Sequence, residues 1–260
     1  MKKIITALLS GIFIALPVFA EETSTTEPVA ARDVRPEDVA AAGQPVRPAV
    51  PAGSEFIVIC GGPALRAWEN SKRHPHDNTW MNFISAAEIR WNQIKSQAKS
   101  GDVLTWLVYK PGYQRRSKED GDDHIKSIEN RAHSLGVNLV WFDPSFQVIE
   151  HLNSAYPRDT VKIASLDYFG HSNRNCWMFD YSNGVDGCSY SFLHNKDLPQ
   201  LKMGSFVDAA HVKSWGCHSA ESFCQEWKRY TGVTMVGTVG KTDYSTGGLP
   251  KVTRAPGWSS

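Results

Sequence analysis

The chain lacks a dominant charge and the signatures of the common phosphate-binding and zinc-binding sites. Its 28 Lys and Arg nearly balance 27 Asp and Glu, and both signs are scattered along the 260 residues. This balance argues against a surface that tracks a polyphosphate backbone, so no nucleic-acid partner is expected. The patterns GxGxxG, GxxxxGK, CxxC and HExxH are all absent. We therefore expect neither a cofactor nor a metal ion.

Long apolar runs are also missing, except at the start of the chain. Lys2 and Lys3 precede an apolar run that contains Pro17 and ends in the small-residue pattern Val18-Phe19-Ala20. This order of features predicts a secretory signal peptide over residues 1–20. The run is short for a bilayer span of ~20 residues, so no stable membrane insertion is expected after signal cleavage. The mature protein should be exported to the bacterial periplasm or the extracellular space.

Large side chains are scarce in the segment that follows the signal peptide. Residues 21–54 are rich in Pro, Ala, Glu, Thr and Val and show neither helical nor strand periodicity. Such a composition cannot bury enough apolar surface to order itself, which predicts a disordered linker or a propeptide. Residues 55–260 remain, and about 200 residues are enough for one domain with a full core.

Strand-like apolar runs alternate with helical patterns through residues 55–260. The runs cover residues 56–60, 103–109, 137–142, 161–169, 206–215 and 233–239. Helical spacing of apolar residues covers 79–98, 123–135, 146–155 and 219–230. A β-hairpin is expected within 175–192, and the basic segment 110–118, followed at once by acidic residues, predicts a solvated loop. The alternation predicts an α/β domain with a mostly parallel sheet flanked by helices on both faces.

Only five cysteines are present, at positions 60, 176, 188, 217 and 224. In an oxidising compartment an odd number implies at least one unpaired thiol, and two disulfides plus one thiol is the most economical assignment. Cys176 and Cys188 bracket a hairpin-like segment with two turn signals, which makes them the best disulfide candidates. Cys217 is then the natural odd thiol, although Cys60 could equally be an inert buried thiol. A disulfide from Cys217 to Cys60 or Cys224 is the alternative.

Two short motifs follow strand-like runs. Phe169-Gly170-His171-Ser172 ends one run, and Trp215-Gly216-Cys217-His218-Ser219 ends another. Functional groups collect at the carboxyl ends of strands in an open α/β sheet, so both motifs are expected to reach one crevice. A free thiol has a pKa of ~8.5 and needs an adjacent base or a helix N-terminus to act as a nucleophile. His171 and the helix expected after Cys217 could supply these, and Gly170 and Gly216 would permit close backbone approach.

The strand-then-His and strand-then-Cys order resembles the caspase-like cysteine peptidases, which include metacaspases, gingipains, clostripain and toxin autoprocessing domains. The resemblance implies a three-layer sandwich and a cysteine endopeptidase acting on a protein or peptide through a thioester. It implies Cys217 as nucleophile, His171 as general acid and base, and the backbone N–H groups of Ser172 and Cys217 as oxyanion donors. Metacaspases have an acidic residue two positions before the cysteine. Trp215 stands there instead, a candidate wall of the substrate cleft, so no preference for Arg or Lys is implied.

Other interpretations of the same residues stay open at this stage. His211, Cys217, His218 and Cys224 are close in sequence and can all bind zinc, but their spacing matches no common signature. The domain could also be a catalytically inactive caspase-fold binding module of the cell envelope. A cysteine-dependent amidase or transpeptidase acting on cell-wall peptides would use the same Cys-His pair.

Overall fold

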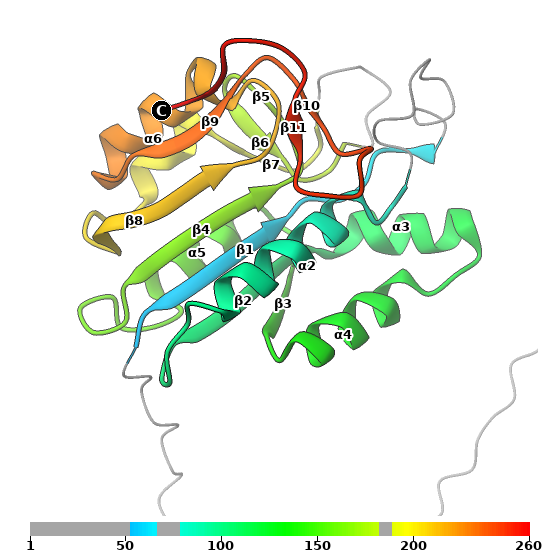
Figure 1. Ribbon diagram of the computed structural model, residues 1–260, viewed down its shortest axis with the longest axis horizontal. Coiled ribbons are helices and arrows are strands. Elements are labelled where there is room, and N and C mark those ends of the chain that lie inside the picture. Colours follow the sequence, from blue (N-terminus) through cyan, green and yellow to red (C-terminus); the bar gives the residue numbers. More distant parts are fainter. Residues whose placement is uncertain (1–52, 67–78, 182–188) are drawn as a thin grey trace, which may run out of the picture. The chain divides into compact units, whose positions relative to one another are not determined.

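A seven-stranded sheet organises the domain in the computed structural model, which describes residues 53–66, 79–181 and 189–260. The strand order is β12-β9-β8-β4-β1-β2-β3, and every neighbouring pair is parallel except β12 with β9 (Figure 1). The sheet strands are β1 (Glu55–Cys60), β2 (Val103–Tyr109), β3 (Asn138–Phe142), β4 (Ile163–Phe169), β8 (Phe206–Ser214), β9 (Met235–Val239) and β12 (Gly257–Ser259). The predicted signal peptide and nearly all of the predicted linker lie outside the described residues.

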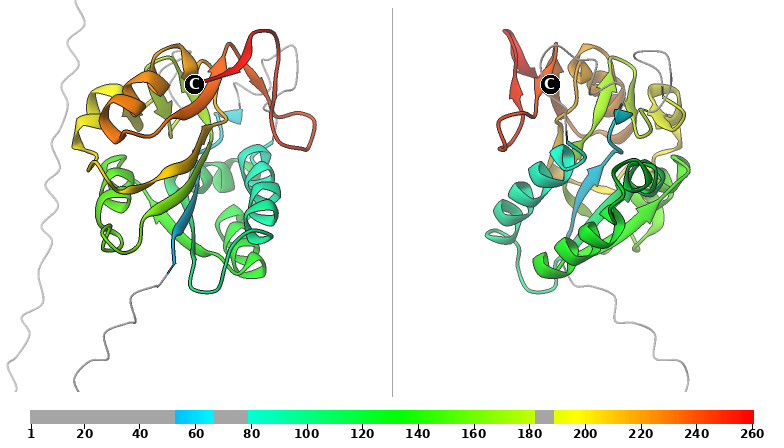
Figure 2. Two further views of the ribbon diagram at one scale, coloured as in Figure 1. Left: turned by 60° about the vertical axis from the view of Figure 1, so that its left-hand side comes forward. Right: turned by 90° about the vertical axis from the view of Figure 1, so that its right-hand side faces the viewer.

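Helices cover both faces of this sheet (Figure 2). The helices are α2 (Asn82–Lys95), α3 (Lys110–Asp120), α4 (His124–Leu135), α5 (Phe146–Ser154) and α6 (Phe223–Thr231), with 3-10 turns η2 (Asn195–Gln200) and η3 (Ser219–Glu221). One apolar cluster joins the sheet to α2 and α4, and the other joins it to α5 and α6. The expected α/β class and mostly parallel sheet are confirmed, and the layers are consistent with a caspase-like sandwich.

The central strands are apolar throughout because both of their sides are covered. In β1, Ile57 and Ile59 face the cluster with α5 and α6, whereas Val58 and Cys60 face the cluster with α2. All four side chains are fully buried. At the centre of the sheet, Ile57 lies opposite Thr105 of β2 and Leu166 of β4.

Two small sheets lie beyond the carboxyl ends of the central strands. β5 (His171–Asn173), β6 (Cys176–Met178) and β7 (Phe192–His194) form an antiparallel sheet directly after β4. β10 (Thr242–Asp243) and β11 (Lys251–Val252) form a short antiparallel pair after β9. Figure 1 shows both sheets near the arrowheads of β4 and β8, so three stretches of the chain meet at this edge.

The basic segment expected as a solvated loop instead forms α3, so that expectation is wrong. Tyr113 is fully buried, and its hydroxyl donates to the Gly61 carbonyl over 2.9 Å. Arg116 is also buried and pairs with Asp120 over 2.9 Å. Tertiary contacts and an i,i+4 ion pair stabilise this helix, which has no apolar stripe for a periodicity criterion to detect.

The helix expected directly after Cys217 is also different in detail. Residues 219–221 form a 3-10 turn, and the α-helix begins only at Phe223. A helix dipole acting on the Cys217 sulfur is therefore not the source of activation that the sequence suggested. Within the described part of the chain, no helix has the length and apolar character needed to cross a membrane.

Candidate active site

The carboxyl ends of β4 and β8 bring the two sequence motifs side by side. The strands are parallel neighbours with Tyr168 opposite Ser214, and the Trp215 amide donates to the Tyr168 carbonyl over 2.8 Å. His171 and Cys217 each follow three residues after this matched pair. The two residues therefore leave adjacent strands at the same edge of the sheet.

A side-chain hydrogen bond joins the motifs directly. Ser172 Oγ donates to the backbone carbonyl of Cys217 over 2.5 Å. Ser172 is buried and lies in β5, immediately after His171. The bond therefore fixes the segment of the histidine against the segment of the cysteine. The backbone N–H groups of Ser172 and Cys217 are the oxyanion donors that the sequence resemblance predicts.

Gly216 permits this close approach because it has no side chain. A Cβ atom there would overlap the Ser172 hydroxyl and lie 2.9 Å from the Gly170 carbonyl oxygen. Gly216→Ala is expected to push the motifs apart, at a cost of ~1–3 kcal/mol in the free energy of unfolding. Denaturant unfolding measures this effect.

Gly248→Ala is the matched control for this prediction. A Cβ atom at Gly248 would meet only the Thr246 hydroxyl, at 3.9 Å. The stability of this variant should stay close to that of the wild type. Equal losses in Gly216→Ala and Gly248→Ala would show that the tight contact at Gly216 has no special role.

Cys217 is a partly exposed residue, and its sulfur lies beside Thr242 of β10. The Thr242 backbone N–H donates to Sγ over 3.4 Å, and its Oγ1 lies 3.5 Å from the same atom. A backbone N–H has no acceptor capacity, so this contact favours negative charge on the sulfur. The segment after β9 thus supplies the stabilisation that the helix after Cys217 does not.

Aromatic side chains surround the His171 ring, which is itself partly exposed. The ring centroid lies 5.1 Å from Phe83 of α2, edge to face, and 4.5 Å from Tyr181. The Tyr168 hydroxyl donates to the His171 carbonyl over 2.7 Å. Burial raises the pKa of Tyr168 well above its usual value, so this hydroxyl stays a neutral donor. The hydrogen bond holds the backbone of His171, and the ring contacts restrict its imidazole.

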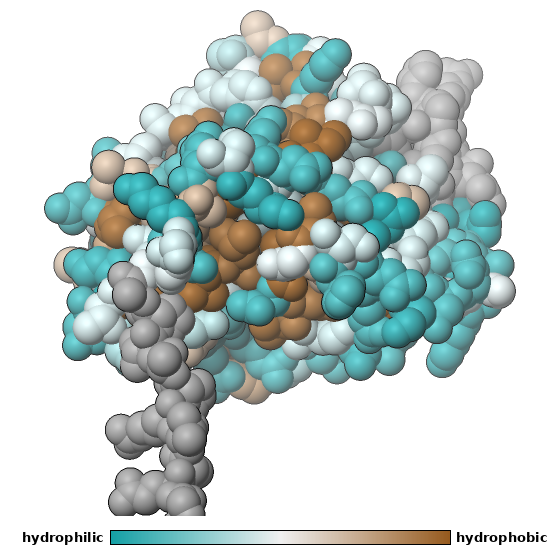
Figure 3. Space-filling model, turned by 60° about the horizontal axis from the view of Figure 1, so that its bottom comes forward, coloured by the Kyte–Doolittle hydropathy of each residue, from teal (hydrophilic) through white to brown (hydrophobic). Residues whose placement is uncertain are grey.

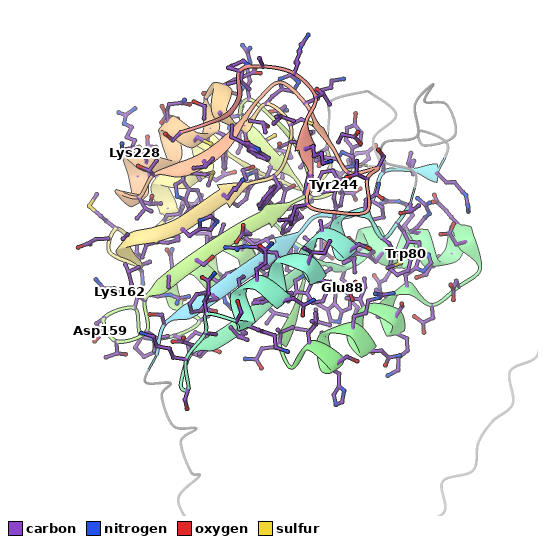
Figure 4. The ribbon with its side chains drawn as sticks, in the orientation of Figure 1. Trp80, Glu88, Asp159, Lys162, Lys228 and Tyr244 are labelled. Atoms are coloured by element: carbon purple, nitrogen blue, oxygen red, sulfur yellow. The ribbon has the colours of Figure 1, made fainter. Side chains whose placement is uncertain are left out.

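Tyr244 connects the C-terminal segment to both motifs. Its ring packs edge to face on Phe83 with centroids 5.0 Å apart, and its hydroxyl donates to the Trp215 carbonyl over 3.0 Å. Figure 4 shows Tyr244 near the carboxyl ends of the central strands. The residues after β9 therefore pack against the histidine side and the cysteine side of the same site.

Glu221 joins three segments that surround the site. Its carboxylate accepts from His218 Nδ1 over 2.5 Å, from the Gly240 N–H over 3.1 Å and from Arg174 over 3.2 Å. Burial alone would raise the pKa of Glu221, but these donors hold it below its ordinary value. His218 also has a left-handed backbone with φ 59°, rare for a residue other than glycine. The turn after Cys217 is thus held in one conformation by a carboxylate.

Trp215, suggested by the sequence as a wall of the substrate cleft, lies in the core. Its ring is 7% exposed and stacks on Phe169 with centroids 5.4 Å apart. Both rings belong to the apolar cluster with α2. Trp215 therefore stabilises the strand ends, and the expectation that it lines an open cleft is wrong.

Asp167 is a fully buried carboxylate on the same side of the sheet as Trp215. It accepts from Arg90 Nε and from Trp215 Nε1, each over 2.8 Å, and His211 Nε2 lies 3.5 Å away. Burial alone would raise the pKa of Asp167, but His211 and Arg90 hold it below its ordinary value. This network ties α2 to β4 and β8.

Two of the five cysteines are free and buried. Cys60 and Cys224 are thiols, so neither forms the alternative disulfide with Cys217, and the expected count of two disulfides is wrong. Burial raises the pKa of each of these two thiols to about 12, which keeps them protonated. Cys176 lies in β6, but Cys188 falls outside the described residues, so the Cys176–Cys188 disulfide stays a prediction.

The residues considered for zinc binding point to different partners. His211 contacts Asp167, His218 contacts Glu221, and the Cys224 sulfur packs against Gly237. Across residues 53–66, 79–181 and 189–260, no three His, Cys, Asp or Glu side chains are grouped to hold a metal ion.

An open pocket of about 460 Å³ lies at the opposite, amino end of the sheet. Its lining includes Phe56, Asp102, Asp159, Lys162 and Val207, and Figure 4 shows Asp159 and Lys162 at this end. The side turned forward in Figure 3 exposes apolar residues in its middle with polar ones around them. The lining of this pocket contains neither Cys nor His, so it does not include His171 or Cys217.

Sequence reasoning missed Thr242, Tyr244 and Glu221 as members of the site. The signal available for Thr242 was its place just after the apolar run 233–239, since residues after any parallel strand collect at the same edge. Comparisons with protein-family models, with curated proteins and with solved structures found no match to the chain.

Proposed function

We propose that the protein is an exported cysteine peptidase in which Cys217 is the nucleophile and His171 the general acid and base. The observation that carries the proposal is the pairing of the two motifs at adjacent strand ends, joined by the hydrogen bond from Ser172 to the Cys217 carbonyl. The resemblance of these motifs to caspase-like peptidases points to the same pair. The signal peptide predicted over residues 1–20 supports export to the periplasm or the extracellular space.

The first half of the proposed reaction forms a thioester. His171 takes the proton of the Cys217 thiol, and the sulfur attacks the carbonyl carbon of the peptide bond, which places negative charge on its oxygen. The backbone N–H groups of Ser172 and Cys217 would receive that oxyanion. The C–N bond then breaks, and the amine leaves with the proton that His171 held.

The second half restores the free enzyme. Water attacks the thioester carbonyl while His171 takes one of its protons, and the carboxylic acid leaves as the proton returns to the sulfur. The Thr242 N–H near the sulfur would stabilise the thiolate both before attack and as the leaving group. No cofactor or metal ion takes part in either half.

The reactivity of the thiol tests this proposal without knowledge of the substrate. Iodoacetamide at pH 6 should alkylate Cys217 at least ~10-fold faster than free cysteine, whose thiolate fraction is below ~1% there. His171→Ala should reduce the rate to that of free cysteine, because the sulfur loses the base that accepts its proton. Mass spectrometry of the labelled peptides measures the rate at Cys217 separately from the other cysteines.

His133→Ala provides the control for loss of a histidine. His133 is exposed on α4, away from the strand ends. Its substitution should leave the alkylation rate unchanged. Alkylation of wild-type Cys217 no faster than free cysteine would reject the peptidase and favour a binding module with the same fold.

A further inference from the structure

The carbonyl oxygen of Gly216 is held by two buried hydroxyl groups. Thr238 Oγ1, on β9, donates to it over 2.6 Å, and Ser219 Oγ donates over 3.3 Å. The Thr238 backbone N–H donates in turn to Ser219 Oγ over 3.3 Å. Thr238 and Ser219 are both fully buried. The peptide group between Gly216 and Cys217 is therefore fixed from the β9 side.

The direction of this carbonyl sets the direction of the Cys217 N–H. A trans peptide group is planar, and its N–H points opposite to its C=O. β8 lies between β9 and β4 in the sheet. Because the Gly216 carbonyl points to Thr238 of β9, the Cys217 N–H points toward the β4 side, where His171 and Ser172 lie.

The peptide group between Cys217 and His218 follows the same rule, and both its C=O and its N–H have a hydrogen-bond partner. The Cys217 carbonyl accepts from Ser172 on the β4 side over 2.5 Å. The His218 N–H on the same peptide group donates to the Gly240 carbonyl, beyond β9, over 2.7 Å. The Gly216 carbonyl thus points toward β9 and the Cys217 carbonyl toward the β4 side. This alternation agrees with a Cys217 N–H that points toward the β4 side.

We propose that Thr238 is a positioning residue that aims the Cys217 N–H at the oxyanion formed during peptide hydrolysis. This role rests on the proposed peptidase function and adds a residue on a third strand to it. An oxyanion donor stabilises the transition state only if its direction is fixed before the reaction. The Thr238 hydroxyl is suited to this task because it is buried and makes the shorter of the two contacts to the Gly216 carbonyl.

Thr238→Val and Thr238→Ser form the test pair. Valine removes the hydroxyl at nearly unchanged shape, whereas serine keeps it. For a fluorogenic peptide that the wild type cleaves, Thr238→Val should lower kcat by ~10–100-fold with KM nearly unchanged, because only the transition state carries the oxyanion. Thr238→Ser should retain most of the wild-type kcat. Thermal unfolding of both variants establishes that each is folded.

Alkylation by iodoacetamide separates positioning from a general disturbance of the site. This reaction displaces iodide at a saturated carbon and forms no oxyanion, so the rate at Cys217 should stay within about 2-fold of wild type in Thr238→Val. Equal kcat in the two variants, or equal losses of kcat and alkylation in Thr238→Val, would overturn the role. Those results presuppose an active wild type. Failure of the wild type to cleave any peptide would instead reject the peptidase function, and this role with it.

Discussion

Cys217→Ala is expected to abolish peptide hydrolysis and leave the fold intact. Without the sulfur no thioester can form, and removal of the nucleophile from a catalytic unit lowers kcat by at least ~10⁴-fold. The side chain is partly exposed, so its removal should cost little packing. Hydrolysis of a fluorogenic peptide measures the loss, and circular dichroism with thermal unfolding measures the fold.

Cys224→Ala is the matched control. Cys224 is a free thiol, but burial raises its pKa to about 12, so it holds no negative charge at neutral pH. Its replacement should keep kcat close to wild type, with any loss confined to stability. Retained hydrolysis in Cys217→Ala would exclude this residue as the nucleophile.

Arg158→Met is expected to lower the free energy of unfolding by ~3–5 kcal/mol at pH 7, because it removes one of the two basic side chains that pair with a buried carboxylate. Glu55, the first residue of β1, is fully buried and accepts from Arg158 and Thr105, each over 2.6 Å, and contacts His151 Nε2 at 2.8 Å. Arg158 also donates to backbone carbonyls at both ends of the loop that joins α5 to β4. Urea unfolding measures the change.

The pH dependence of the stability difference between wild type and Arg158→Met tests whether the Glu55 charge causes this loss. Burial alone would raise the pKa of Glu55, but His151, Arg158 and Thr105 hold it below its ordinary 4.5. This carboxylate therefore stabilises the wild type above pH ~4.5, and the contribution is lost as the pH falls through its lowered pKa. Without Arg158, fewer groups offset the effect of burial on Glu55, so the pKa of Glu55 in the folded state should rise. The stability gap between wild type and Arg158→Met should then narrow as the pH falls below ~5.

Arg229→Met is the control for loss of a surface arginine. The Arg229 side chain is 70% exposed and lies 3.7 Å from Glu226. Exposed pairs of this kind contribute little, so the change should stay within ~0.5 kcal/mol. A similar stability loss in Arg158→Met and Arg229→Met, or a loss in Arg158→Met that does not depend on pH, would contradict Glu55 as the cause.

The strands were predictable because buried parallel strands are short, apolar and bounded by polar turns. The run 103–109 matches β2 at both ends, and 206–215 exceeds β8 by one residue. The helix α3 was not predictable in this way. Its buried face consists of Gly112, Tyr113 and Arg116. Tyr113 and Arg116 donate to the carbonyls of Gly61 and Ala64, more than 50 positions away, and local periodicity carries no trace of such contacts.

The same distinction applies to the site. His171 and Cys217 were identifiable because each follows its strand within three residues, and adjacent parallel strands end together. Thr242 and Thr238 depend on the position of β9 beside β8, which the sequence does not state. Whether Trp215 lies in the core or lines a cleft stayed open, because a side chain next to Cys217 can face either side of the sheet.

The chain enters the domain at the edge of the sheet remote from the reactive sulfur. The Gly53 N–H donates to the Gly101 carbonyl over 3.1 Å beside the start of β1, whereas Cys217 follows the end of β8. A surface coupled at Gly53 itself would therefore hold the domain by the amino end of its sheet. The carboxyl ends of the strands, with Cys217, would then face the solution.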